Sequence, residues 1–177
     1  QNMYPATSAY NCCRCFKLET DFKLDLFERA CQLLVQQYPI LNTELVVENG
    51  RIYQTPKTST SLLVQKENIS HLEANQVIPY LKEKVKVPFD FETESLFRVN
   101  VLDKSPRETF VVLTIHHIIF DGGSGYPLLN SLLGFYQALL SGDQPLIRPH
   151  GNYYEEFIRR QQSMLKSEDG AQRLAYW

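Results

Sequence analysis

The chain has 177 residues, close to the roughly 150 of one average domain, and 44% of them are hydrophobic, which excludes a disordered protein. Eighteen lysines and arginines oppose 20 acidic residues, for a net charge of −2. No bulk field therefore attracts nucleic acid or an anionic membrane. We expect neither as a partner, and we expect recognition to depend on a local site.

Four cysteines are present: Cys12, Cys13 and Cys15 share one expected strand, and Cys31 falls in an expected helix. This spacing does not fit a disulfide framework or a metal site, because adjacent strand residues point to opposite faces. We interpret all four as small buried residues in a reducing cytoplasm. No apolar run approaches the roughly 18 residues of a membrane span, and no signal peptide opens the chain. A cytoplasmic location is the expectation.

Hydrophobic periodicity and turn residues divide the chain into strands and helices. In the first part of the chain we expect a strand (13–19), a helix capped by Asp25 (26–38), and two strands about Asn49-Gly50 (43–47 and 51–55). Next we expect a strand (61–65), a helix containing Pro79 (75–85) and two strands (96–102 and 109–116). The last expected elements are a helix closed by Ser141-Gly142 (128–139), a more polar helix (152–165) and a terminal helix reaching 177.

The expected fold class is α/β. Residues 110–115 are apolar on both faces, which favours a central, buried strand. Helices and strands alternate loosely with hairpins among them, so we expect a two-layer sandwich in which helices pack on a mixed β-sheet. The chain begins at Gln1 without an initiator methionine and stops at Trp177, which is typical of a piece of a longer protein.

The segment with the clearest chemical signal is HHIIFDGGSG, from His116 to Gly125, at the end of the central strand. An imidazole has an ordinary pKa near neutrality, so a histidine displayed there can take a proton from an attacking amine, hydroxyl or thiol. Asp121 is placed to hold the turn through a cation or backbone donors. Gly122 and Gly123 allow close approach of a ligand and positive φ.

Blander interpretations of this segment remain open. Paired histidines at a strand end are often satisfied locally, and Asp-Gly-Gly is an ordinary turn. Zinc is disfavoured because adjacent rings diverge and no third ligand lies nearby. Ser124 lacks the Gly-x-Ser-x-Gly context of a nucleophile, and the segment lacks the Gly-Lys-Ser/Thr element of a phosphate loop.

The pattern His-His-x-x-x-Asp-Gly, here His116 to Gly122, resembles the signature of condensation domains of nonribosomal peptide synthetases, within the chloramphenicol acetyltransferase-like superfamily. Further stretches resemble that family in the same order, and together they cover nearly the whole chain: 9–11, 16–18, 38–43, 88–90, 153–157 and 176–177.

The resemblance implies that residues 1–177 are the N-terminal lobe of a two-lobed condensation domain whose C-terminal lobe is absent. It implies amide formation between acyl and aminoacyl thioesters, with His117 as general base or amine-positioning group. His116 and Gly122 would shape the turn, and Asp121 would pair with an arginine from elsewhere in the domain. No cofactor would bind directly. Donor and acceptor carrier proteins would deliver the substrates on phosphopantetheine arms between the lobes.

The chain departs from the family pattern at two positions: Tyr38 and Asn42 stand where the family has histidine and arginine. The lobe alone is expected to be inactive. An epimerisation domain, which carries the same His-His-x-x-x-Asp-Gly motif, stays open within the family. Two further alternatives remain: a free-standing O- or N-acyltransferase that uses acyl-CoA, and a non-catalytic module that binds a partner protein. The presence of His117 disfavours the second.

Overall fold

The computed structural model describes residues 7–57, 64–91, 94–147 and 153–176, which form two compact units, 1–147 and 148–177. The first unit contains β1 (Asn11–Leu18), α1 (Leu24–Gln37), a 3₁₀ turn η1 (Pro39–Asn42), β2 (Thr43–Glu48), β3 (Arg51–Pro56), β4 (Val64–Asn68), α2 (Ala74–Lys86), β5 (Phe97–Ser105), β6 (Glu108–His116) and α3 (Gly125–Leu140). The second contains α4 (Tyr153–Leu165) and α5 (Glu168–Tyr176).

The main sheet has the strand order β1-β6-β5-β4. β6 is antiparallel to both of its neighbours, and β4 runs parallel to β5. The mixed sheet and the central place of β6 are therefore confirmed. Every residue of β6 after Glu108 is buried, because helices cover both of its faces.

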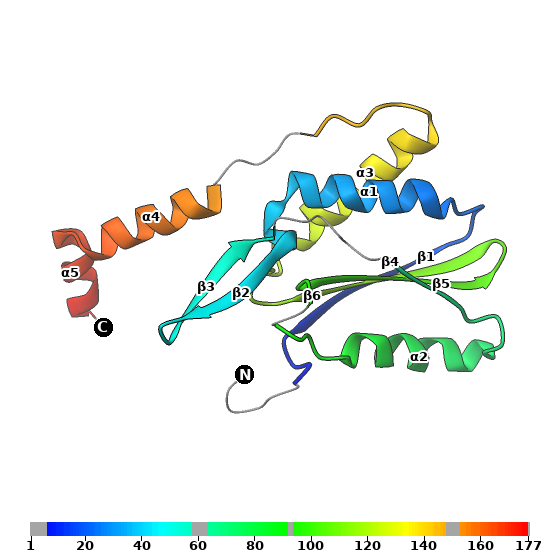
Figure 1. Ribbon diagram of the computed structural model, residues 1–177, viewed down its shortest axis with the longest axis horizontal. Helices are drawn as coiled ribbons and strands as arrows, with labels where there is room; N and C mark the ends of the chain where they lie inside the picture. Colours follow the sequence, from blue (N-terminus) through cyan, green and yellow to red (C-terminus); the bar gives the residue numbers. More distant parts are fainter. Residues whose placement is uncertain (1–6, 58–63, 92–93, 148–152, 177) are drawn as a thin grey trace. The chain divides into compact units, whose positions relative to one another are not determined.

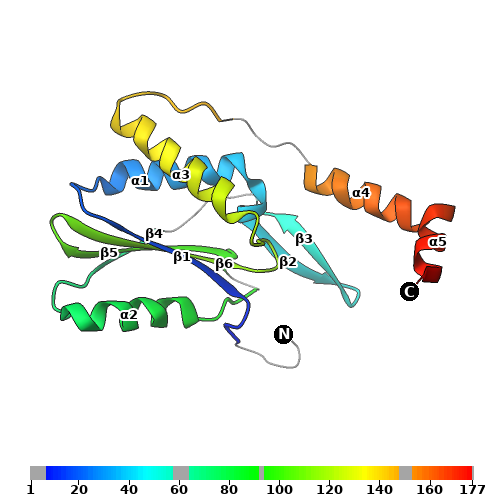
Figure 2. The same cartoon turned by 180° about the vertical axis from the view of Figure 1, so that it is seen from behind.

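The helices lie on both sides of this sheet: α1 and α3 cover one face and α2 covers the other (Figures 1 and 2). The α1–α3 side buries Leu34 and Leu132 against Val111 and Leu113, and the α2 side buries Val77 and Leu81 with other apolar residues. The predicted class, a mixed sheet packed by helices, is confirmed. The layers differ from expectation: there are three instead of two, because the second face of the sheet also carries apolar residues, Leu102, Phe110 and Val112, which α2 covers.

The ends of α1 and α2 follow from local sequence. Asp25 was expected to cap α1, but Lys23 is the N-cap and Asp25 lies in the first turn, where its charge favours the helix dipole. In α2 the side chains of Glu73 and Gln76 form a capping box, and the helix continues through Pro79. The proline removes one backbone donor but does not end the helix.

The predicted hairpin about Asn49-Gly50 is confirmed as β2–β3, a separate two-stranded sheet. Asn49 and Gly50 have φ values of 52° and 73°, the left-handed pair that the tightest hairpin turns require. The strand expected at 61–65 falls partly outside the described residues, and β4 begins at Val64. Asn152 and Trp177, at the ends of the last two expected helices, also lie outside them.

The cysteines are free, and only part of their interpretation is right. Cys31 is buried, Cys12 and Cys13 are half-buried, and Cys15 is exposed. The burial expected for Cys15 was wrong because β1 is an edge strand whose α2-facing side is covered only in part. None of the helices that the structure describes is long and apolar enough to cross a membrane.

Candidate active site

The candidate site is the turn that joins β6 to α3. The buried strand ends at His116, and two successive backbone bonds then reverse the chain: Ile119 N–H donates to the His116 carbonyl (3.1 Å) and Phe120 N–H to the His117 carbonyl (3.4 Å). Side chains that were close in sequence consequently separate into a buried set and an exposed set.

His116 belongs to the buried set, with 8% of its surface exposed. Its ring meets the edges or faces of three aromatic rings, those of Phe91 (centroids 4.8 Å apart), Phe89 (6.0 Å) and Tyr10 (6.0 Å). Burial, and then the charge of the neighbouring His117, lower the pKa of the His116 imidazole. This histidine is therefore a neutral part of the framework at pH 7.

His117 belongs to the exposed set. Its amide N–H donates to the Tyr10 carbonyl (2.8 Å), so the backbone is fixed although the side chain is in solvent. A rigid backbone that presents an exposed imidazole at a strand end is the arrangement that general base chemistry needs.

Asp121 is exposed, and its described partners are within the turn. Its Oδ1 accepts from the Ser124 amide (2.8 Å) and the Ser124 hydroxyl (2.6 Å). These bonds hold the pKa of the Asp121 carboxyl below its ordinary value. The arginine partner that the resemblance implies is not bound to Asp121 among the residues that the structure describes, and this carboxylate is not buried.

The two glycines of the turn behave differently from the expectation drawn from their sequence. Neither Gly122 nor Gly123 has a positive φ; in the described chain that conformation is found at Gly50 and Gly142 among the glycines. A Cβ built on Gly122 meets nothing within 4 Å, so the backbone there faces open space. Open space at Gly122 is compatible with close approach of a substrate to the turn.

Sequence reasoning missed a contact between Arg14 on β1 and Gly125 at the start of α3. A Cβ on Gly125 would lie 2.5 Å from the Arg14 Nη2, and the same guanidinium lies over the Phe120 ring, 5.5 Å from its centroid. Arg14 is thus an arginine that reaches the turn. The sequence feature that could have indicated this contact is an arginine in an otherwise apolar strand segment. Arg14 reaches the turn because β1 pairs with β6.

The two positions that depart from the family pattern have structural contacts. The Tyr38 hydroxyl lies 2.9 Å from the Ser131 hydroxyl and so links the end of α1 to α3. The Asn42 amide donates to the Lys57 carbonyl (3.2 Å) beside the β2–β3 sheet. Both residues therefore hold elements of the first unit together.

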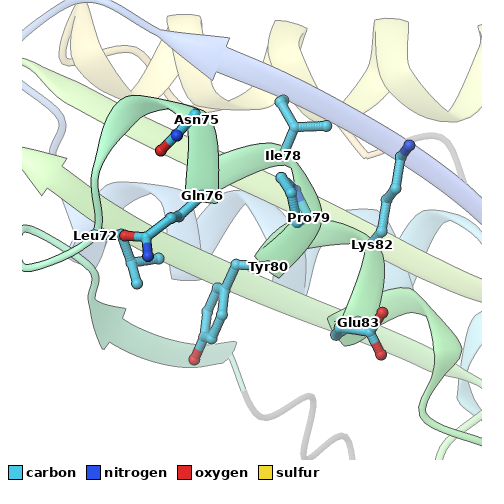
Figure 3. Close-up of a pocket in the computed structure, with 8 residues that line it drawn as sticks. All are labelled: Leu72, Asn75, Gln76, Ile78, Pro79, Tyr80, Lys82 and Glu83. Atoms are coloured by element: carbon cyan, nitrogen blue, oxygen red, sulfur yellow. The ribbon is translucent and has the colours of Figure 1, made fainter.

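Two grooves of the described chain lie away from the turn. One, of about 610 Å³, lies along α2, where Leu72, Asn75, Pro79 and Tyr80 contribute to its wall (Figure 3). The other, of about 440 Å³, includes Lys104 and Thr109, at the opposite end of β6 from His116. Neither groove is lined by a residue of the turn.

Known proteins similar to this chain point to one family. The family model described as "Condensation domain" matches residues 1–177. The polyketide synthase PksN of Bacillus subtilis (strain 168) is 37% identical over 177 residues, and tyrocidine synthase 3 of Brevibacillus parabrevis is 32% identical over 174. These matches cover 100% and 97% of this chain, and 3% of each relative.

Solved structures agree on the fold. The starter condensation domain of the rhizomide synthetase RzmA superposes with a TM-score of 0.86 at 20% identity, over 100% of this chain and 45% of that one. The chain therefore spans less than half of the solved domain and a small part of the curated relatives that it matches.

Proposed function

Because the chain belongs to the condensation-domain family, whose members transfer acyl or peptidyl groups, we propose that it is the N-terminal lobe of a domain that joins two thioester-bound substrates through an amide bond. The observation that carries the proposal is the exposed His117 at the end of the buried strand β6, with its backbone fixed by the Tyr10 carbonyl.

In this proposal His117 accepts the proton of the attacking amine. A thioester is already activated, so the enzyme mainly has to bring the amine nitrogen to the carbonyl carbon and remove a proton from that nitrogen. The carbon–nitrogen bond forms, the carbon–sulfur bond breaks, and the free thiol of the donor arm leaves with a proton.

The other residues of the turn support this role. His116 shapes the turn from the buried side, and Asp121 stabilises it through Ser124. The open space at Gly122 leaves room for the thioester. The substrates would arrive on phosphopantetheine arms of donor and acceptor carrier proteins, between this lobe and a second one. The 45% coverage of the solved domain supports the need for that second lobe, and we expect the 177-residue chain alone to form no product.

The test uses a complete condensation domain that contains this lobe, with loaded donor and acceptor carrier proteins. His117→Ala should lower the rate of amide formation by roughly 10²- to 10⁴-fold, the usual contribution of a positioned acid–base group, with an unchanged melting temperature. His71→Ala is the matched control: His71 is exposed before α2 and should leave the rate unchanged.

Two results would contradict the proposal. Full product formation by His117→Ala would favour a module that binds a partner without catalysis. Equal rates with free acyl-CoA and an alcohol, in place of the two carrier proteins, would favour a free-standing acyltransferase.

A further inference from the structure

Residues 87–91, which follow α2, lie against the ends of β1, β5 and β6. We call residues 87–91 the crossing segment. Asn11, which is opposite His116 in the β1–β6 register, donates from its side-chain amide to the carbonyls of Val85 (2.7 Å) and Val87 (2.9 Å). Arg98 on β5 donates from Nη1 to the same Val87 carbonyl (3.1 Å). The crossing segment is thus tied to both strands that flank β6.

Arg98 contacts the crossing segment at several points. Its side chain is only 10% exposed, and its Nη2 donates to the Pro88 carbonyl (3.3 Å) and to Glu94 Oε2 (2.6 Å). Its guanidinium carbon lies 4.4 Å from the centroid of the Phe89 ring. A planar group with five donors can satisfy this set of acceptors while it stacks on a ring, whereas the single ammonium of a lysine cannot.

The crossing segment in turn encloses His116. Phe89 and Phe91 meet the imidazole almost perpendicularly, at 84° and 87°, the edge-to-face geometry that aromatic rings prefer. The Nδ1 of His116 accepts a hydrogen bond from the Ile118 amide (3.2 Å), so Nδ1 carries no proton and the ring proton is on Nε2. This bond fixes the backbone on the far side of His117, whose own amide is held by Tyr10.

We propose that Arg98 is a positioning residue for His117: it fixes the crossing segment, whose two phenylalanine rings hold His116 in one tautomer, and His116 then fixes the turn that presents His117. The inference rests on the proposed function of His117, and it adds a residue 19 positions earlier in the chain. Among the residues that the structure describes, the titratable and charged groups near the His116 ring include Tyr10, His117 and the Arg98–Glu94 pair behind Phe89.

The test combines nuclear magnetic resonance of a complete, ¹⁵N-histidine-labelled condensation domain with steady-state kinetics. In the parent, the Nδ1 signal of His116 should be that of an unprotonated nitrogen at about pH 8 and should remain so to a lower pH than in an ordinary imidazole, because burial lowers its pKa. Arg98→Lys should give a mixture of tautomers and lower kcat roughly tenfold with little change in KM. The matched control is Arg107→Lys, an exposed residue in the β5–β6 turn, which should change neither readout.

A second variant covers the event that Arg98→Lys fails to fold. Phe91→Leu keeps Arg98 and removes one ring, and it should raise the pKa of His116 toward its ordinary value. An unchanged His116 spectrum and kcat in a folded Arg98→Lys or Phe91→Leu domain would overturn the positioning role, whatever His117→Ala does. Conversely, full activity of His117→Ala would overturn the proposed function while the His116 spectra still report whether Arg98 holds that ring.

Discussion

Alanine substitution at two glycines of α3 should have opposite effects on stability. Gly134 lies mid-helix, and a Cβ there meets nothing within 4 Å. Gly134→Ala should therefore stabilise the fold by about 0.5–1 kcal/mol, the difference between glycine and alanine in a helix interior. At Gly125 the same change places a Cβ 2.5 Å from the Arg14 Nη2.

The expected cost of Gly125→Ala follows from the displacement of Arg14. Its Nη2 must retreat by about 0.9 Å to reach 3.4 Å, where ordinary contact begins. That movement weakens the cation–π contact with Phe120, about 0.5–1 kcal/mol, and the hydrogen bond from Arg14 to the Cys13 carbonyl, about 0.5–1.5 kcal/mol. Helix propensity returns part of this at the first helical position, which leaves a net loss of about 1 kcal/mol.

Thermal unfolding of the parent and the two variants, followed by circular dichroism, measures the difference. For a chain of this size 1 kcal/mol moves Tm by about 2–4 °C, so Gly125→Ala should melt below the parent and Gly134→Ala above it. If Gly125→Ala melts as high as Gly134→Ala, then Arg14 is not packed against the start of α3.

Two further outcomes are expected. Ser124→Ala removes the hydroxyl bond, the largest cause of the lowered pKa of Asp121, and keeps the amide bond, so this pKa should rise part of the way toward about 3.9 in a carboxyl titration by nuclear magnetic resonance. The stabilisation that the parent gains from the hydroxyl is present above that pH and is lost as the pH falls through the lowered pKa, so the stabilities of the two should converge in acid. An unmoved pKa would show that the Ser124 hydroxyl is not its cause. Burial raises the pKa of the Cys31 thiol far above its ordinary value, so a maleimide at pH 8 should label the exposed Cys15 and spare Cys31 until the chain unfolds. Mass spectrometry of the peptides measures which cysteine is labelled, and early labelling of Cys31 would contradict its burial.

Local sequence was sufficient where the deciding contacts are local. The β2–β3 turn follows from Asn49-Gly50, because few other residue pairs adopt two successive positive φ values. The central position of β6 follows from residues 110–115, which are apolar on both faces. The two histidines were predicted to be the site because they directly follow this buried strand.

Other features depended on contacts between distant segments. The three layers arise because α2 packs on the face opposite to α1 and α3, and helical periodicity does not tell which face of a sheet a helix covers. Asp25 was expected to be the N-cap of α1, but the N-cap is Lys23, two positions earlier. Such an error is common where backbone geometry sets the end of a helix. The partners that the structure gives Asp121 are the amide and the hydroxyl of Ser124, three positions away, and the arginine pairing that the resemblance implies stays a prediction.

The sequence by itself determined which residues are chemically able to act: two histidines, an aspartate and flexible glycines at the end of a buried strand. Only the tertiary structure decided that His116 is buried among aromatic rings and His117 is exposed, because this depends on how the segment before β5 crosses the sheet. It also brought Arg14 to Gly125 and Arg98 to Phe89. Periodicity encodes which side chains prefer burial, whereas the pairing of strands far apart in the chain fixes which polar groups meet.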